Sequence, residues 1–308
     1  LTAQIIVNDD TVLTCDDLAA AFAEDDIVCI WNSSTSHEAT TITLENCDHV
    51  LTEGQELRIQ NLVKIRLDNS TITLTKDAKI KGENLGGSDL IKEGPGTAVV
   101  FGDDCEDCAI SDIGIIGGEL GPDGVIGIEM LGSESTGNEV SSVKFIEIET
   151  GIIVEGSHNR FYDLHFIKVG GDDDCDETNN NSAAIWLKSS NDNEIVNVLH
   201  RSSAGAITLW LNGQCDQNTV LNLTVEQESF QCTDEDNIPE GEPWGDPSLY
   251  IDSGESINNF ITTNFNGGWV RIPNQNFRAV CEYNSISALH NPPTLSCKGS
   301  STTPNCNN

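Results

Sequence analysis

Apolar and polar residues follow one recurring order along most of the chain. A leading residue, usually asparagine, is followed by apolar residues two, five and seven positions later, and this unit recurs about every 20 to 40 residues. The leading asparagines are Asn138, Asn159, Asn193, Asn218, Asn258 and Asn284, and Cys108 takes the same place before Ile110, Ile113 and Ile115. Because so short a unit cannot bury its own apolar face, we expect the units to stack as coils of a solenoid about 4.8 Å apart.

A second apolar pattern precedes each leading residue. Its apolar positions alternate with polar ones, which is typical of half-buried strands. The expected inward pairs are Ile128/Met130, Ile152/Val154, Ile185/Leu187, Ile207/Leu209 and Leu249/Ile251. Each coil therefore contains at least two strands that share one core.

Asparagine suits the corner of such a coil. It tolerates left-handed backbone conformations, and its amide can bond to the same amide in the coils above and below. With these corners, residues of about 27 to 291 resemble the right-handed parallel β-helix of the pectin-lyase-like superfamily. The resemblance implies an all-β, single-stranded right-handed parallel β-helix.

The N-terminal residues fit the cap of such a fold. Thr14 and Asp17 are spaced as a capping box and predict a helix of about residues 15–24 that plugs the first coil. We expect a β-helix domain with this cap at residues 1–291. The Ser/Thr/Asn-rich residues 292–308 predict an irregular tail that contains cysteines.

Cysteines and sequons favour an oxidising compartment. The chain has 11 cysteines without paired zinc-type spacing, so disulfides are expected, including one from Cys15 to Cys29 that would attach the cap. The odd count leaves one thiol buried and inert, or available to a second chain through Cys297 or Cys306. Asn-x-Ser/Thr acceptors, which predict N-glycans, occur at Asn32, Asn69, Asn180 and Asn222. With a start at Leu1 and no apolar leader, these features predict a secreted, extracellular protein.

The charge limits the partners. Asp and Glu number 50 and Lys and Arg 15, which gives a net charge of −35. Nucleic-acid binding needs clustered basic residues and is excluded, and anionic membrane surfaces are disfavoured. Apolar stretches are interrupted before the roughly 18 residues that a membrane-spanning helix needs.

Three insertions, at residues 117–125, 169–183 and 227–247, follow the third apolar position of their coils, so stacking should align them along one edge. The central insertion carries Asp172, Asp174 and Asp176, a spacing typical of Ca²⁺ loops. Glu177 replaces the glycine of an EF-hand loop and Ala183 its bidentate glutamate. Weak Ca²⁺ binding and simple solvation of these carboxylates are the alternatives.

Aromatic residues occupy outward positions of the second strand. We expect Trp186, Thr208 and Tyr250 in one column of side chains, with Lys188 and Trp210 in the neighbouring column. Such a surface can stack sugar rings, contact another protomer or lie under the insertions.

The residues that suit catalysis are few. Asp103 and Asp104 lie in a Gly-Asp-Asp-Cys segment that resembles the polygalacturonase signature, but the other signature segments of that family are missing. Lys168, Lys188 and Arg201 are possible bases of a lyase, and Asp172, Asp174 and Asp176 are candidate catalytic acids near them. His200 falls at an inward position, where a hydrogen-bonded core histidine is expected.

Three functions fit these observations. The first is a non-catalytic β-helix of an extracellular fibre, appendage, sheath or matrix, which requires no cofactor and assembles with itself or with other matrix components. The second is a secreted polysaccharide lyase or glycoside hydrolase, which the resemblance implies. The third is carbohydrate binding through Trp186, Trp210 and Tyr250.

Overall fold

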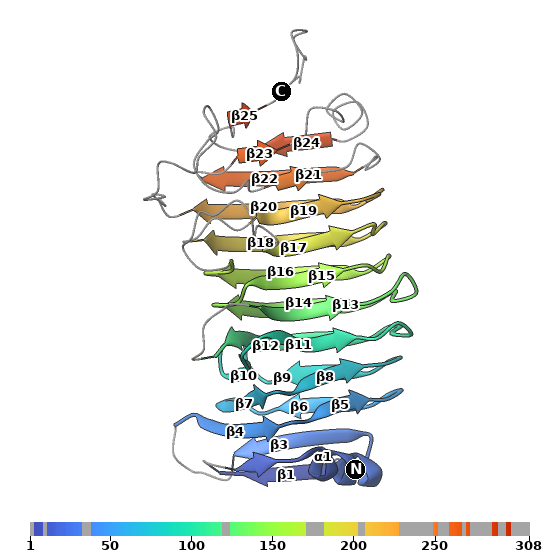
Figure 1. The fold of residues 1–308 in the computed structure, drawn as a ribbon, viewed down its shortest axis with the longest axis vertical. Helices are drawn as coiled ribbons and strands as arrows, with labels where there is room; N and C mark the ends of the chain where they lie inside the picture. Colours follow the sequence, from blue (N-terminus) through green and yellow to red (C-terminus); the bar gives the residue numbers. More distant parts are fainter. Residues whose placement is uncertain are drawn as a thin grey trace.

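The computed structural model is a parallel β-solenoid of about eight turns with a helix at its N-terminal end (Figure 1). It describes residues 3–8, 11–32, 38–118, 124–170, 182–202, 207–227, 249–251, 259–266, 269–271, 285–288 and 294–296. The fold class predicted from the repeating pattern is confirmed. Within these residues, the structure has no helix long and apolar enough to cross a membrane.

Helix α1 (Cys15–Glu24) caps the first coil, as the capping box predicts. The Asp17 backbone N–H donates to Thr14 Oγ1 over 3.3 Å, and the Thr14 N–H donates to Asp17 Oδ2 over 2.8 Å. The helix buries Leu18 and Phe22 against the first strands. It thereby covers the apolar interior at the N-terminal end of the stack.

The strands form two parallel sheets. The strands of the 15-stranded sheet are β1 (Ala3–Val7), β2 (Val12–Leu13), β3 (Ile27–Asn32), β4 (Thr40–Glu45), β6 (Glu56–Ile59), β7 (Val63–Asp68), β9 (Lys79–Gly82), β10 (Ser88–Glu93), β12 (Ala109–Gly117), β14 (Glu139–Ile146), β16 (Arg160–Ile167), β18 (Glu194–Ser202), β20 (Thr219–Gln227), β22 (Phe260–Asn266) and β24 (Ser285–Ala288). The strands of the 10-stranded sheet are β5 (Asp48–Leu51), β8 (Thr71–Leu74), β11 (Gly96–Phe101), β13 (Val125–Met130), β15 (Thr150–Val154), β17 (Ala183–Lys188), β19 (Ile207–Asn212), β21 (Leu249–Ile251), β23 (Trp269–Arg271) and β25 (Thr294–Ser296).

The number of strands that each coil contributes to the 15-stranded sheet changes at β12. Before it, each coil has two separate strands, so that β9 pairs with the first part of β12 and β10 with the second. From β12 onward one continuous strand spans both parts and bends at Asp112, whose φ is 58°. The equivalent residues of the later strands also have positive φ; they are Ser142, Asp163, Asn197 and Asn222.

The core consists of the inward side chains of both sheets. The predicted apolar positions of the described repeats are buried; among them are Ile110, Ile113, Ile115, Val140, Val143, Phe145, Phe161, Leu164, Phe166, Ile195, Val198, Val220, Leu223 and Val225. The rings of Phe145 and Phe166 stack with centroids 4.7 Å apart. One apolar column therefore continues from coil to coil.

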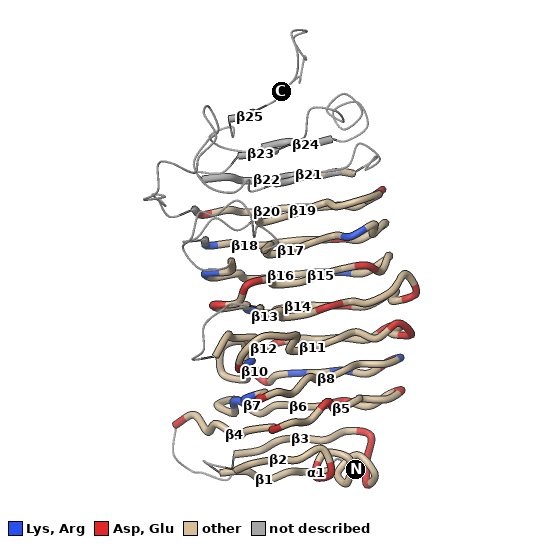
Figure 2. Tube along the Cα trace, in the orientation of Figure 1, with Lys and Arg blue, Asp and Glu red and all other residues tan. Residues whose placement is uncertain are grey.

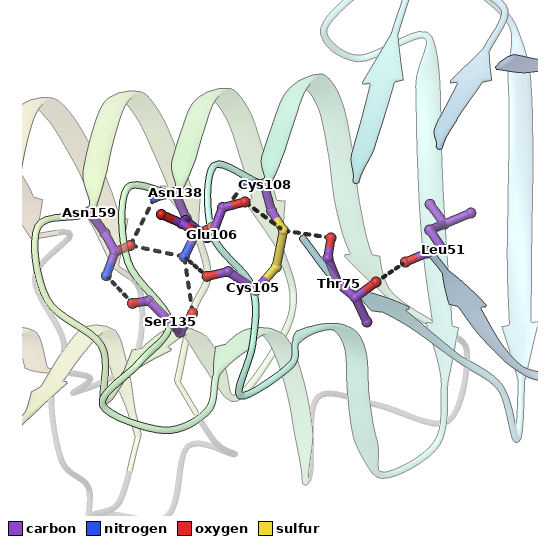
Figure 3. Close-up of a disulfide and its surroundings, with 8 residues drawn as sticks. All are labelled: Leu51, Thr75, Cys105, Glu106, Cys108, Ser135, Asn138 and Asn159. Carbon is purple, nitrogen blue, oxygen red and sulfur yellow. Dashed lines mark hydrogen bonds between the residues drawn. A yellow bond between two sulfur atoms is a disulfide. The ribbon is translucent and has the colours of Figure 1, made fainter. Parts of the chain in front are cut away.

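A buried ladder of asparagines joins successive coils at one corner (Figure 3). The backbone N–H of Asn138 donates to Asn159 Oδ1 over 3.0 Å, and that of Asn159 donates to Asn193 Oδ1 over 3.0 Å. The N–H of Asn193 donates in turn to Asn218 Oδ1. The ladder starts at Cys108, whose N–H donates to Asn138 Oδ1 over 2.9 Å. The vertical file of corner residues is thus confirmed.

The next member of the ladder is Asn259, not Asn258. The Asn218 N–H donates to Asn259 Oδ1 over 2.9 Å, and the buried Ile261, not Phe260, pairs with Val220. A register shift after this pair then aligns Thr263 with Leu223 and Phe265 with Val225. Asn284 lies outside the described residues.

Three further expectations are corrected. Cys15 bonds to Cys47, not to Cys29, because Cys47 lies in the turn under α1. In β19 the residues paired with Ile185 and Leu187 are Leu209 and Leu211, so the inward pair Ile207/Leu209 is wrong by two residues. The tail at 292–308 is not wholly irregular, because Thr294–Ser296 form β25 and pair with β23.

Candidate functional site

The aromatic residues form one column, which differs from the two columns expected. Trp186 of β17 pairs in register with Trp210 of β19, and Trp210 pairs with Tyr250 of β21. The two-residue correction in β19 removes Thr208 from this column and places Trp210 there. The Trp186 and Trp210 rings stack with centroids 4.2 Å apart and an interplanar angle of 4°.

Lys188 completes this cluster. Its Nζ lies 4.1 Å from the centroid of the Trp186 ring, a distance typical of a cation–π contact. Trp210 is only 7% exposed, and Ile207 and Ala183 are buried beside it in an apolar cluster separate from the main core. Trp186 is half-buried. The expectation that all three aromatic side chains face solvent is therefore wrong for Trp210, and the side chain of Tyr250 lies outside the described residues.

Asp103 and Asp104 lie in the turn that precedes the ladder. Both side chains are exposed, and the segment leads into the Cys105–Cys108 disulfide, which closes the corner at the start of the ladder (Figure 3). The Asn138 Nδ2 group donates to the Cys105 carbonyl oxygen over 3.2 Å. The cysteine of the Gly-Asp-Asp-Cys segment is thus part of the disulfide and the hydrogen bonds of this corner.

The candidate bases are not brought together. Lys188 belongs to the 10-stranded sheet, whereas Arg201 belongs to β18 of the 15-stranded sheet. Arg201 Nε lies 2.7 Å from Glu226 Oε2, and Lys168 Nζ lies 2.9 Å from Glu147 Oε1. Both cations are exposed and serve as ion-pair partners between neighbouring coils. Asp172, Asp174 and Asp176 lie outside the described residues.

His200 is a core residue, as its inward position predicts. It is fully buried and its Nδ1 lies 2.7 Å from Thr208 Oγ1, while its ring meets Phe166 edge-on. Burial lowers the pKa of His200 to about 4, and a backbone interaction with Val169 opposes this shift. The imidazole is therefore neutral at neutral pH and has no path to a surface substrate.

The predicted insertions leave the solenoid along one edge. They follow β12, β16 and β20, which lie in the same sheet and run in parallel, so the described ends of these strands are on the same side. Figure 2 shows acidic residues distributed along the described coils rather than gathered in one patch. Within the described coils, the acidic charge is therefore spread along the stack.

A second cluster of chemically reactive groups lies under the cap. Cys15, Cys47 and His49 have ligand atoms within 4.8 Å of one another, and the two sulfurs form a disulfide. Burial lowers the pKa of His49. Sequence spacing does not predict this group, because the two cysteines are 32 residues apart. His49 belongs to β5, whose sequence carries no metal-binding motif.

The described glycosylation acceptors occupy different settings. Asn69 is exposed, Asn32 is half-buried at the end of β3, and Asn222 is exposed with its Nδ2 donating to Asn197 Oδ1 over 2.9 Å. Asn180 lies outside the described residues, as do Cys297 and Cys306. N-glycosylation at the four acceptors stays a prediction.

Comparison with known proteins adds no family. No protein-family model matches the chain, and neither the curated proteins nor the solved structures contain a match. The fold alone therefore defines the class of this protein, which is a parallel β-solenoid.

Proposed function

We propose that this protein is a secreted, non-catalytic structural β-solenoid that assembles with itself into an extracellular fibre, appendage, sheath or matrix. The continuous stack of coils, joined by the buried asparagine ladder from Cys108 to Asn259, is the observation that carries the proposal. Such a stack produces a stiff body. The candidate bases Arg201 and Lys168 are held in ion pairs, which fits a structural role.

The N-terminal end offers the contact for assembly. The large hydrophobic residues that are exposed in the described part of the chain are Ile6, Val12, Trp31 and Val50, all in the first coils. Ile6 is 68% exposed on β1, the edge strand of its sheet, and pairs in register with Trp31. Residues 3–8 carry no charged side chain. An open, uncharged edge favours strand addition by a second copy of this acidic chain.

Assembly is tested on the purified chain by light scattering and negative-stain microscopy. The wild type should form oligomers or filaments, and Ile6→Lys should shift them toward monomers, because it places a charge on the open edge. Lys144→Ala, which changes a half-buried residue of β14 far along the stack from β1, is the control. A wild-type chain that remains monomeric at all concentrations, under reducing and non-reducing conditions, would contradict the proposal.

Carbohydrate binding or cleavage is the second candidate, and the half-buried Trp186 with Lys188 over its ring favours it. The resemblance to pectin-lyase-like β-helices supports the same candidate. Incubation with a polysaccharide panel should then release reducing or unsaturated sugars, or Trp186→Ala should abolish binding. Activity that survives in the Asp172→Asn/Asp174→Asn variant would remove these carboxylates as catalytic groups.

Calcium binding by Asp172, Asp174 and Asp176 belongs to both candidates. A melting temperature that rises with Ca²⁺ and returns after chelation would support it, and identical melting curves would remove it.

A further inference from the structure

Three side chains from three elements converge beneath the N-terminal cap. Cys15 is the first residue of α1, Cys47 lies in the turn between β4 and β5, and His49 belongs to β5. Their sulfur and nitrogen atoms all lie within 4.8 Å of one another. Cys47 is 1% exposed, while Cys15 is half-buried and gives the cluster an edge toward solvent.

His49 has an unused nitrogen in this cluster. The residue is 7% exposed, and its Nε2 is buried without a hydrogen-bond partner. The Phe22 ring stacks on the imidazole with centroids 5.7 Å apart and holds its plane. Because a buried nitrogen without a partner is destabilising, a ligand that this nitrogen could bind would remove the cost.

We propose that Cys15, Cys47 and His49 form a Zn²⁺ site when the Cys15–Cys47 disulfide is reduced. Two thiolates and one imidazole are typical zinc ligands, with Zn–S bonds of about 2.3 Å and Zn–N bonds of about 2.0 Å. Ligand atoms at those distances from one ion lie about 3.5–3.8 Å apart in tetrahedral geometry. The observed cluster needs only a small separation of the sulfurs to reach this arrangement. A water molecule would take the fourth position on the side of Cys15.

A small thiol serves as the reductant. Two thiol molecules give up two protons and two electrons to the cysteine sulfurs, the Cys15–Cys47 S–S bond breaks, and the two small thiols join as a disulfide. Zn²⁺ then replaces the two cysteine protons, which pass to buffer, and two Zn–S bonds and one Zn–N bond form. The cap is therefore fastened to the first coils in either state, by a covalent bond when oxidised and by the metal when reduced.

Local structure holds both cysteines in place. Cys15 is the first residue of a helix of 10 residues whose N-terminus is closed by the Thr14–Asp17 capping box. The Cys47 backbone N–H donates to Ser70 Oγ over 2.9 Å, which fixes the turn that carries the second sulfur.

The first experiment uses the full chain reduced with a small thiol, freed of it without oxygen, and titrated with Co²⁺ as a coloured probe for Zn²⁺. Wild type should bind one Co²⁺ per chain at this site, with sulfur-to-cobalt charge-transfer bands and the visible bands of tetrahedral cobalt. Even the loss of an outer-shell partner weakens metal binding about 10- to 100-fold, so His49→Gln should weaken this binding by at least about tenfold. Zn²⁺ should displace the cobalt and bleach the bands.

Matched controls separate this cluster from the other thiols and histidines. Cys29→Ser removes a thiol that is unbonded in the described structure, and His165→Gln removes a half-buried histidine of β16. Both variants should bind Co²⁺ with the stoichiometry and affinity of the wild type. Equal cobalt binding by wild type and His49→Gln, with His49→Gln folded by circular dichroism, would overturn the proposal.

The second experiment needs no variant. The reduced wild type is exposed to air with or without Zn²⁺, and Cys15 and Cys47 are then mapped by alkylation and mass spectrometry. With Zn²⁺ both residues should stay reduced and protected from alkylation, whereas without it the Cys15–Cys47 peptide should return. Formation of that disulfide at the same rate in both samples would overturn the proposal.

Discussion

The coils before and after Cys108 satisfy the same corner in different ways. At Ala78 the backbone N–H donates to the Thr75 carbonyl oxygen within its own turn. From Cys108 onward the corner N–H donates instead to an asparagine side chain of the next coil. The early corners are therefore closed locally, whereas the later corners bond one coil to the next.

The strands differ in parallel with the corners. The early coils use separate pairs such as β6 with β7 and β9 with β10, while β12 and its successors run through a single left-handed residue. The same solenoid thus tolerates two local solutions, because the inward apolar positions are retained in both. We expect the later half to respond more strongly to single polar substitutions, since its buried polar groups are shared between coils.

The largest effect is expected from Asn159→Ala. Asn159 Oδ1 accepts from the Asn138 N–H, and its Nδ2 donates to the Ser135 carbonyl oxygen over 3.2 Å. Each buried group left without a partner costs roughly 1–3 kcal/mol, so the stability should fall by about 4 kcal/mol. Urea unfolding measures the loss. If Asn159→Ala unfolds at the wild-type midpoint, the ladder does not join the later coils.

The next effect concerns His200 and pH. Unfolding raises the pKa of His200 from about 4 to its ordinary value of 6.5, so the unfolded state binds more protons between these values. The contribution of neutral His200 to the free energy of unfolding is complete above about pH 6.5. It is lost as the pH falls toward 4, a difference of roughly 3 kcal/mol. His200→Leu should flatten the stability profile in this window, measured by urea unfolding at several pH values. The exposed His158→Gln serves as control, and an unchanged slope in His200→Leu would refute the assignment.

A smaller effect is expected from Cys105→Ala/Cys108→Ala at the boundary between the two halves. The disulfide spans 3 positions in sequence. So short a loop restricts the unfolded chain little, and its removal should cost about 2 kcal/mol. Thermal unfolding under non-reducing conditions tests this, with Cys29→Ser as the single-thiol control. A loss as large as that of Asn159→Ala would mean that the bond, rather than the ladder, organises the boundary.

The smallest effect is expected from Asn197→Gly. Asn197 belongs to an exposed ladder, in which its Nδ2 donates to Asp163 Oδ1 over 3.0 Å. Water replaces these bonds when the side chain is removed, and glycine tolerates the φ of 57°. The free energy of unfolding should change by less than about 1 kcal/mol. A loss comparable to that of Asn159→Ala would erase the distinction between the buried and exposed ladders.

The sequence predicts the coil, its cap and most of its inward side chains, because these follow from periodicity and a capping box. It does not distinguish Asn258 from Asn259, since either of these neighbouring asparagines can lead the repeat that contains β22. A slip of two residues in β19 preserves the alternation of inward and outward positions, so the pattern alone could not separate Ile207/Leu209 from Leu209/Leu211. Spacing also cannot assign Cys47 to Cys15.

A second column of polar residues can be read from the sequence. Four positions after Cys108, Asn138, Asn159, Asn193 and Asn218 stands a short polar residue; these are Asp112, Ser142, Asp163, Asn197 and Asn222. All have positive φ and mark the bend of the long strands. Asp and Asn are enriched in this conformation, so the column was open to prediction for most of its members.

The spacing of the coils also sets how densely the molecule is charged along its axis. Coils about 4.8 Å apart bring exposed carboxylates of the stack close to those of the coils above and below, in a chain whose net charge is −35. Unit charges in water interact with the thermal energy at about 7 Å, which is more than one coil spacing, so cations will gather around the solenoid. Any lengthwise contact between two such bodies would release part of this ion atmosphere, and raising the salt concentration would alter its strength.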